Sequence, residues 1–121
     1  MAATEYDFID DQAIEQGTTW ARQFIWKDSE GTPVDLSGYT ARMQLRTNVA
    51  ATGEPLLELS TENGGITLGG IAGTVDIVAA AEQTAAMTVL SGVYDLELVS
   101  DQGIVTRLLQ GRFKVSREVT R

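Results

Sequence analysis

The sequence predicts an all-β protein: an antiparallel β-sandwich of seven or eight short strands with one short helix. Three observations carry this prediction. Apolar and polar side chains alternate in several segments, turn residues separate those segments, and residues 79–87 alone are rich in helix formers without alternation. The sequence lacks the regular succession of helices and strands that builds a parallel sheet.

The clearest strand is predicted over residues 39–46. Four apolar side chains share one parity there and four polar side chains share the other: Tyr39, Ala41, Met43 and Leu45 against Thr40, Arg42, Gln44 and Arg46. A period of two predicts a strand with one buried face and one wet face. Pro33 and Gly38 supply turn chemistry before it. On the wet face, Arg42 and Arg46 are candidate partner contacts.

The remaining strands are shorter or less regular. In residues 18–26, Trp20, Phe24 and Trp26 share a parity, and we interpret them as core residues and not as a platform for sugar rings. Further strands are predicted over residues 56–60, 66–68, 74–78, 93–99, 104–109 and 113–115. Near the end of the chain, Gly111 predicts a β-bulge, and four apolar residues share a parity: Val105, Leu109, Phe113 and Val115.

Length and composition limit the classes of function. At 121 residues we expect one sandwich domain over residues 12–121, preceded by a flexible acidic arm over residues 1–11. No apolar run is long enough to span a bilayer, and the N-terminus lacks a secretory signal, so no membrane contact is expected. The net charge of −8 disfavours nucleic-acid binding.

Acidic and basic residues concentrate at opposite ends of the chain. Residues 1–15 hold five acids and no base, whereas residues 107–121 hold five bases and one acid. These ends can pair within one molecule or between copies of it, as in a repeating contact. The candidate contacts are Asp7, Asp10, Asp11, Arg112, Lys114, Arg117 and Arg121. The three aspartates lack the glycine and distal glutamate of a calcium loop, so we predict no metal site.

No catalytic constellation is predicted. The chain has neither histidine nor cysteine, and its clearest carboxylate pair is Asp95 and Glu97, two residues apart on one strand face. Such a pair suits a glycosidase, but outward acids are typical of any solvated strand, which is the interpretation we favour. The stretch 69–73 is rich in glycine but lacks the Lys-Ser/Thr of a phosphate-binding loop. We therefore expect no enzyme and no cofactor.

Residues 31–46, together with residues 15–20, resemble small structural proteins of tailed bacteriophages. Matching patterns occur at residues 56–66, 94–98, 105–111 and 118–121, so the resemblance covers roughly residues 13–121. The sequence is similar to the N-terminal domain of phage upper baseplate proteins. The matching positions are structural, so no functional residue can be transferred from that family to this chain.

This resemblance implies an immunoglobulin-like sandwich and a virion protein made in the host cytoplasm. The expected function is to join or anchor other virion proteins in several copies, with partners that include those proteins and copies of itself. The chain ends where a baseplate protein continues into a linker and further domains, so a tail, neck or capsid-surface location is expected instead. Capsid decoration, a head fibre or a carbohydrate-binding module on Trp20 or Trp26 are the alternatives.

Overall fold

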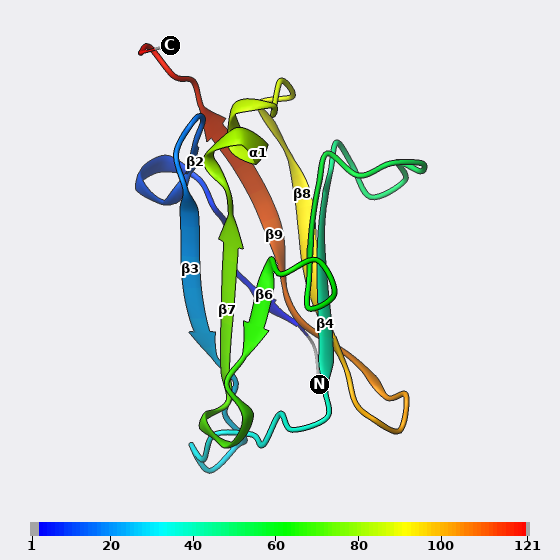
Figure 1. Ribbon diagram of the computed structural model, residues 1–121. Coiled ribbons are helices and arrows are strands. Elements are labelled where there is room, and N and C mark those ends of the chain that lie inside the picture. Colours follow the sequence, from blue (N-terminus) through cyan, green and yellow to red (C-terminus); the bar gives the residue numbers. More distant parts are fainter. Residues whose placement is uncertain (1–2, 121) are drawn as a thin grey trace.

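A computed structural model describes residues 3–120 as two β-sheets packed face to face (Figure 1). The larger sheet has the strand order β1-β9-β8-β4-β5, with β2 also paired to β9, and the smaller sheet has the order β3-β7-β6. The nine strands are β1 (Thr4–Glu5), β2 (Ile14–Glu15), β3 (Trp20–Ile25), β4 (Thr40–Arg46), β5 (Leu57–Ser60), β6 (Ile66–Leu68), β7 (Thr74–Ala79), β8 (Ser91–Val99) and β9 (Val105–Ser116).

This strand order confirms the immunoglobulin-like sandwich. Strands β9, β8, β4 and β5 follow the order G, F, C, C′ of a variable-type domain, and β3, β7 and β6 follow B, E, D. Three short helices complete the described chain: η1 (Asp10–Gln12), η2 (Gly70–Ala72) and α1 (Ala81–Ala85). None of these helices is long and apolar enough to cross a membrane.

The core lies between the two sheets and follows the predicted alternation on β4. Ala41, Met43 and Leu45 are buried, whereas the intervening residues reach the opposite face of the sheet. Trp20 on β3 is 2% exposed, which confirms its core position. Helix α1 lies within the predicted helical stretch, and the buried Thr84 anchors it by donating a hydrogen bond to Thr18 O, 2.7 Å away.

We expected a flexible acidic arm over residues 1–11, but residues 4–11 are packed on the sandwich, and residues 1 and 2 lie outside the described part of the chain. Strand β1 and then β2 run parallel to β9 along its edge, and between them Phe8 N donates to Arg112 O. Phe8 is fully buried, with its ring centroid 4.9 Å from that of Trp20 and 4.8 Å from that of Tyr94. An apolar anchor therefore fixes this acidic segment to the domain.

Gly111 has a different role from the predicted bulge. A Cβ atom at this position would collide with the carbonyl oxygen of Tyr6, so the glycine lets the N-terminal segment approach β9 closely. The register between β8 and β9 instead shifts at Leu108, because Leu96 pairs with Leu109 and Glu97 with Arg107. This shift reverses the parity of the preceding residues, so Val105 is 53% exposed and not part of the predicted apolar face.

The free side of β5 is covered by a side chain. Asn63, in the turn after β5, accepts a hydrogen bond from Ser60 N at 2.9 Å, and its amide nitrogen donates to Glu58 O at 3.0 Å. The side-chain amide thereby occupies edge groups that another strand would use. On the other side of the sheet, β1 and β2 cover β9, so the edge strands there are only two residues long each.

Candidate functional site

The outer face of the larger sheet is the candidate functional site. Its side chains form rows that run across the strands, because the register places residues of five strands opposite one another. We call this surface the charged face and define it by the following residues: Glu5, Arg42, Gln44, Arg46, Glu58, Val93, Asp95, Glu97, Arg107, Gln110 and Arg112.

The middle row of the charged face alternates acids and amides. From one edge of the sheet to the other it reads Glu58, Gln44, Asp95, Gln110 and Glu5. Gln44 Nε2 donates to Glu58 Oε2 at 2.5 Å, and Gln110 Nε2 donates to Glu5 Oε1 at 2.7 Å. Both amides thus turn their donors toward the outer acids and away from Asp95.

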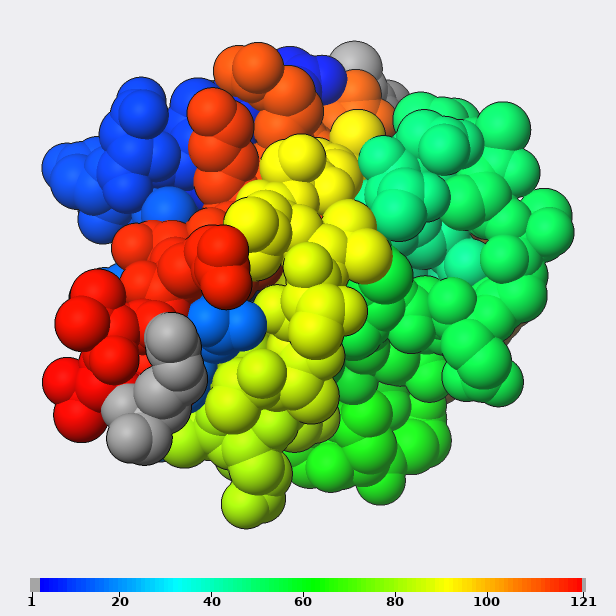
Figure 2. Space-filling view, turned by 90° about the horizontal axis from the view of Figure 1, so that it is seen from above, coloured from blue at the N-terminus to red at the C-terminus, as the bar shows by residue number. Residues whose placement is uncertain are grey.

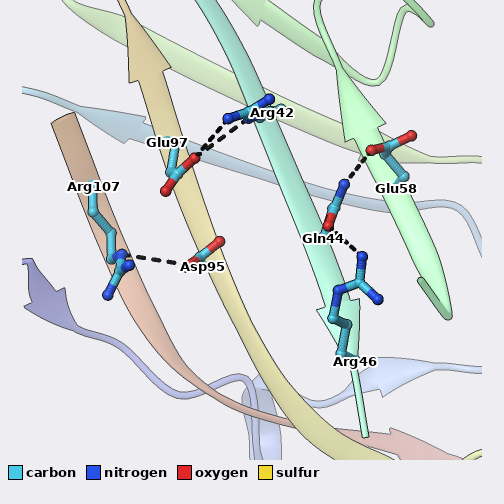
Figure 3. A network of polar contacts seen from close by, with 7 residues as sticks. All are labelled: Arg42, Gln44, Arg46, Glu58, Asp95, Glu97 and Arg107. Carbon is cyan, nitrogen blue, oxygen red and sulfur yellow. Dashed lines mark hydrogen bonds and ion pairs between the residues drawn. The ribbon is translucent and has the colours of Figure 1, made fainter. Parts of the chain in front are cut away.

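A basic row lies on each side of the middle row. Arg42, Glu97 and Arg107 form one of them. Arg42 lies 3.3 Å from Glu97, and Arg107 reaches across to Asp95 with Nε 3.5 Å from the carboxylate (Figure 3). The guanidinium of Arg107 also donates to Gln110 Oε1 at 3.1 Å. Every arginine of this row therefore contacts an acid on a neighbouring strand.

The second basic row joins the N-terminal segment to the sheet. Val93 separates Arg46 on β4 from Arg112 on β9. Arg46 donates to Gln44 Oε1 and to Gly53 O, each at 2.9 Å. Arg112 pairs with Asp7 at 3.0 Å, and its backbone N–H donates to the same carboxylate at 2.9 Å.

Two carboxylates of this region have pKa values shifted in opposite directions. Hydrogen bonds from the backbone and then the guanidinium of Arg112 lower the pKa of Asp7. Burial, followed by the negative charge of Glu97, raises the pKa of Asp95, and these effects outweigh the attraction of Arg107. Ionisation of Asp95, at the centre of the charged face, is therefore less favourable than ionisation of Asp7.

An open groove of about 440 Å³ lies over this part of the charged face. Asp95, Gln110 and Arg46 are among its lining residues, and Asn48, Val49 and Ala51 line it from the connection between β4 and β5. Val49 is 91% exposed. This connection projects from the sandwich in Figure 1. In Figure 2, which views the molecule from above, the connection lies at the right, and residues 10–19 and the C-terminal part of β9 lie at the left.

The structure brings four of the sequence-predicted contact residues together. Arg42 and Arg46 lie on the charged face as expected from the β4 alternation, and Asp7 meets Arg112 beside them. The acidic and basic ends therefore pair within the molecule at this point. The other candidates do not join the cluster: Asp10 and Asp11 lie in η1, Lys114 and Arg117 are exposed farther along the chain, and Arg121 lies outside the described residues.

Two features, one on the charged face and one at the edge of its sheet, were not predicted from the sequence. The pairing of Glu5 with Gln110 joins residues 105 positions apart, and the cap by Asn63 depends on the rotamer of one turn residue. The sequence carried a weak signal for the first, since Tyr6 and Phe8 share a parity against two acids. It carried none for the second beyond the turn itself.

The side chains of the charged face can recognise a partner through ion pairs and hydrogen bonds. Asp95 and Glu97, the carboxylate pair considered for catalysis, each contact an arginine. Within residues 3–120, no group of three or more histidine, cysteine or acidic side chains is arranged to hold a metal ion. Trp20 is buried and cannot serve as a sugar platform, while the half-buried Trp26 meets Tyr39 edge-on with centroids 6.1 Å apart.

No protein-family model matches this chain, and no curated protein matches it. Among solved structures, it is similar to one described as Drosophila OTK, extracellular domains 3-5, at 14% identity and a TM-score of 0.37. The match covers 97% of this chain and 33% of that one, so the chain spans about one third of its length. A similarity of this size assigns no function, and the fold described above depends on the strand order and register.

Proposed function

We propose that this chain is a non-enzymatic structural protein of a tailed-bacteriophage virion, a tail, baseplate or neck component that joins or anchors other virion proteins in several copies. One observation carries the proposal. The stretch that resembles phage baseplate proteins, residues 31–46, includes β4, and β4 supplies Arg42, Gln44 and Arg46 to the charged face. Strand β4 therefore belongs both to the stretch that resembles the phage family and to the charged face.

The charged face contributes little to the stability of the fold and is suited to binding a protein partner. Three of its four arginines are exposed, with 58% of the Arg42 side chain, 52% of the Arg107 side chain and 65% of the Arg112 side chain accessible. Exposed ion pairs contribute only about 0–1 kcal/mol each to stability. Charges set in fixed rows provide specificity and register toward a complementary surface. The intended partners are other virion proteins, assembled in the host cytoplasm.

The partner surface is expected to be protein and not nucleic acid. Each arginine of the basic rows has a polar partner within the chain, and the chain as a whole carries a net charge of −8. A phosphate backbone would have to displace those partners and approach a negative molecule. A surface with both signs of charge can instead exchange some of these contacts for equivalent ones across an interface.

The test is incorporation into particles of a phage that carries this gene. With the gene deleted and supplied in trans, we expect the wild-type chain in purified virions by mass spectrometry, and immunogold electron microscopy assigns it to tail or capsid. Arg42→Glu places an acid opposite Glu97 on the charged face and should reduce incorporation at least about tenfold.

Lys27→Glu is the matched control, because it makes the same charge change at an exposed residue away from the charged face. Both variants are first compared with wild type by thermal unfolding. A chain found only in the soluble fraction of the lysate, with none in purified particles, would contradict the proposed function. Gold label confined to the capsid would support the capsid-decoration alternative.

A further inference from the structure

The smaller sheet has an edge that residues 3–120 leave open. Among these residues, β3 pairs with β7 on one side and with no named strand on the other, at the left of Figure 1. Trp26 N donates to Gly73 O, which fixes the hydrogen-bonding phase of this antiparallel pair. Alternation from that point turns the backbone groups of three residues toward the open edge: Ala21, Gln23 and Ile25.

The side chains on this edge are exposed and uncharged. Ile25 is 49% exposed, and Val78 on the neighbouring β7 is 39% exposed and lies opposite Ala21. Gln23 donates to Asp76 at 2.7 Å on the same outer surface. Within β3 the only formal charge is Arg22, whose guanidinium carbon lies 5.7 Å from the centre of the Trp20 ring. This edge therefore contrasts with the arginine rows of the larger sheet.

We propose that a second copy of this chain binds here, by antiparallel pairing of β3 with β3 about a two-fold axis at Gln23. Two three-stranded sheets would then become one continuous sheet across the dimer. In this register, Gln23 lies opposite Gln23 of the other copy, and Ala21 lies opposite Ile25. The exposed backbone groups of these residues would exchange hydrogen bonds across the axis.

Self-complementarity identifies the occupant as another copy. Pairing about Gln23 sets a small residue against a large apolar one and an amide against an amide, with no like charges directly opposite. Arg22 lies opposite Phe24 of the other copy, where a cation can meet an aromatic ring. Two molecules of net charge −8 repel each other least where their surfaces are neutral, and β3 is such a surface.

One contact must change when the dimer forms. The Arg22 guanidinium donates to Ala21 O at 2.8 Å and so occupies one acceptor of the open edge. This contact joins adjacent residues on an exposed part of the strand, and the guanidinium can exchange it for Phe24 of the second copy. The other edge strand of this sheet, β6, has only three residues and offers a shorter pairing surface.

This inference deepens the proposed function, on which it rests for its biological setting, since a protein used in several copies needs a contact between them. It is tested on the purified full chain by sedimentation velocity across the micromolar range. We expect a concentration-dependent monomer–dimer equilibrium. A chain that stays monomeric throughout this range would overturn the pairing, and particle incorporation of that same chain would leave the proposed function standing.

Two double variants test the register. A21K/I25K sets lysine opposite lysine twice in the proposed dimer, and should raise the dissociation constant at least about tenfold. A21K/I25E sets lysine opposite glutamate at the same positions and should return the constant to within about threefold of wild type. V49K/I104K adds the same charge at two highly exposed apolar residues in the β4–β5 and β8–β9 connections of the larger sheet, and should leave the constant unchanged.

A backbone variant provides an independent test. Gln23→Pro removes the N–H that faces the open edge, whereas Gln23→Ala keeps this N–H and loses the same side-chain bond to Asp76. Proline should abolish dimerisation and alanine should preserve it. If both variants dimerise like wild type, or if A21K/I25K and A21K/I25E behave alike, the second copy does not pair at β3.

Discussion

The two sheets of this sandwich treat their edges and outer faces in opposite ways. In the larger sheet the long strand β9 and the strand β5 are covered by other parts of the chain, and the outer face carries charges. The smaller sheet has an open edge at β3 and a largely neutral outer face. Strand edges that stay open invite pairing with other chains, and covered edges leave recognition to side chains. We therefore propose recognition through side chains for the larger sheet and through the backbone for the smaller one.

The two covers of the larger sheet differ greatly in size. On one side it is a whole segment, residues 4–15, held by the buried ring of Phe8 and by hydrogen bonds to β9. On the other side it is the single amide of Asn63. Because the two covers differ so much in buried surface, removing them should have effects of very different size.

The largest effect is expected from Phe8→Ala. Deleting a fully buried aromatic ring costs about 3–5 kcal/mol through lost burial and the cavity that remains. The free energy of unfolding is measured by urea denaturation with tryptophan fluorescence, since the ring packs against Trp20. Val49→Ala, at a 91% exposed residue, should change it by less than about 0.5 kcal/mol.

Amide hydrogen exchange in Phe8→Ala shows whether the edge of β9 has opened. The backbone N–H groups of Tyr6 and Phe8, which bond to Gln110 O and Arg112 O, should lose protection before the rest of the sandwich. A loss of less than about 1 kcal/mol, with protection of these amides intact, would mean that the N-terminal segment is not anchored by its ring.

An intermediate effect is expected from Asn63→Ala. The substitution removes three hydrogen bonds that involve Ser60 N, Gly65 N and Glu58 O, and it should cost about 1–3 kcal/mol. It also opens the edge of β5, so self-association that does not depend on β3 should appear in sedimentation velocity. Asn48→Ala, which removes two exposed loop hydrogen bonds, from Ala50 N and to Thr47 Oγ1, is the matched control. Equal stabilities of the two variants would show that Asn63 is not a structural cap.

How much of this could be read from the sequence depends on the range of the interactions. The alternation on β4 is local, and it correctly placed Ala41, Met43 and Leu45 in the core and Arg42 on the wet face. The short helix within residues 79–87 was also indicated by local composition. These elements depend on side-chain parity and turn chemistry, which neighbouring residues determine.

The charged face could be predicted only in part, because its rows depend on the pairing register of strands distant in sequence. The extra residue at Leu108 shifts that register and exposes Val105, an effect that no parity count along β9 contains. The N-terminal segment was misjudged for a related reason. Its acids suggested solvent, but Phe8 reaches a core that forms only when β3 and β8 are in place.

The smallest effects are expected from the two carboxylates of the charged region, and they should have opposite signs. Asp7 has a lowered pKa, so its contribution to stability is present at neutral pH and disappears as the pH falls through that pKa. Asp95 has a raised pKa because burial and Glu97 disfavour its charge. Its ionisation therefore lowers stability as the pH rises through the raised value.

Asp7→Asn should consequently destabilise the protein at pH 7, and Asp95→Asn should stabilise it. On acidification the Asp95 difference should shrink first, because its pKa is raised, and the Asp7 difference should persist to lower pH, because its pKa is lowered. Urea denaturation of the two variants and the wild type at several pH values measures this. Asp95 is 40% exposed and paired with Arg107, so solvent screening keeps the gain small. A loss of stability in Asp95→Asn at pH 7 would show that the bond to Arg107 outweighs burial, and that the centre of the charged face is satisfied without a partner.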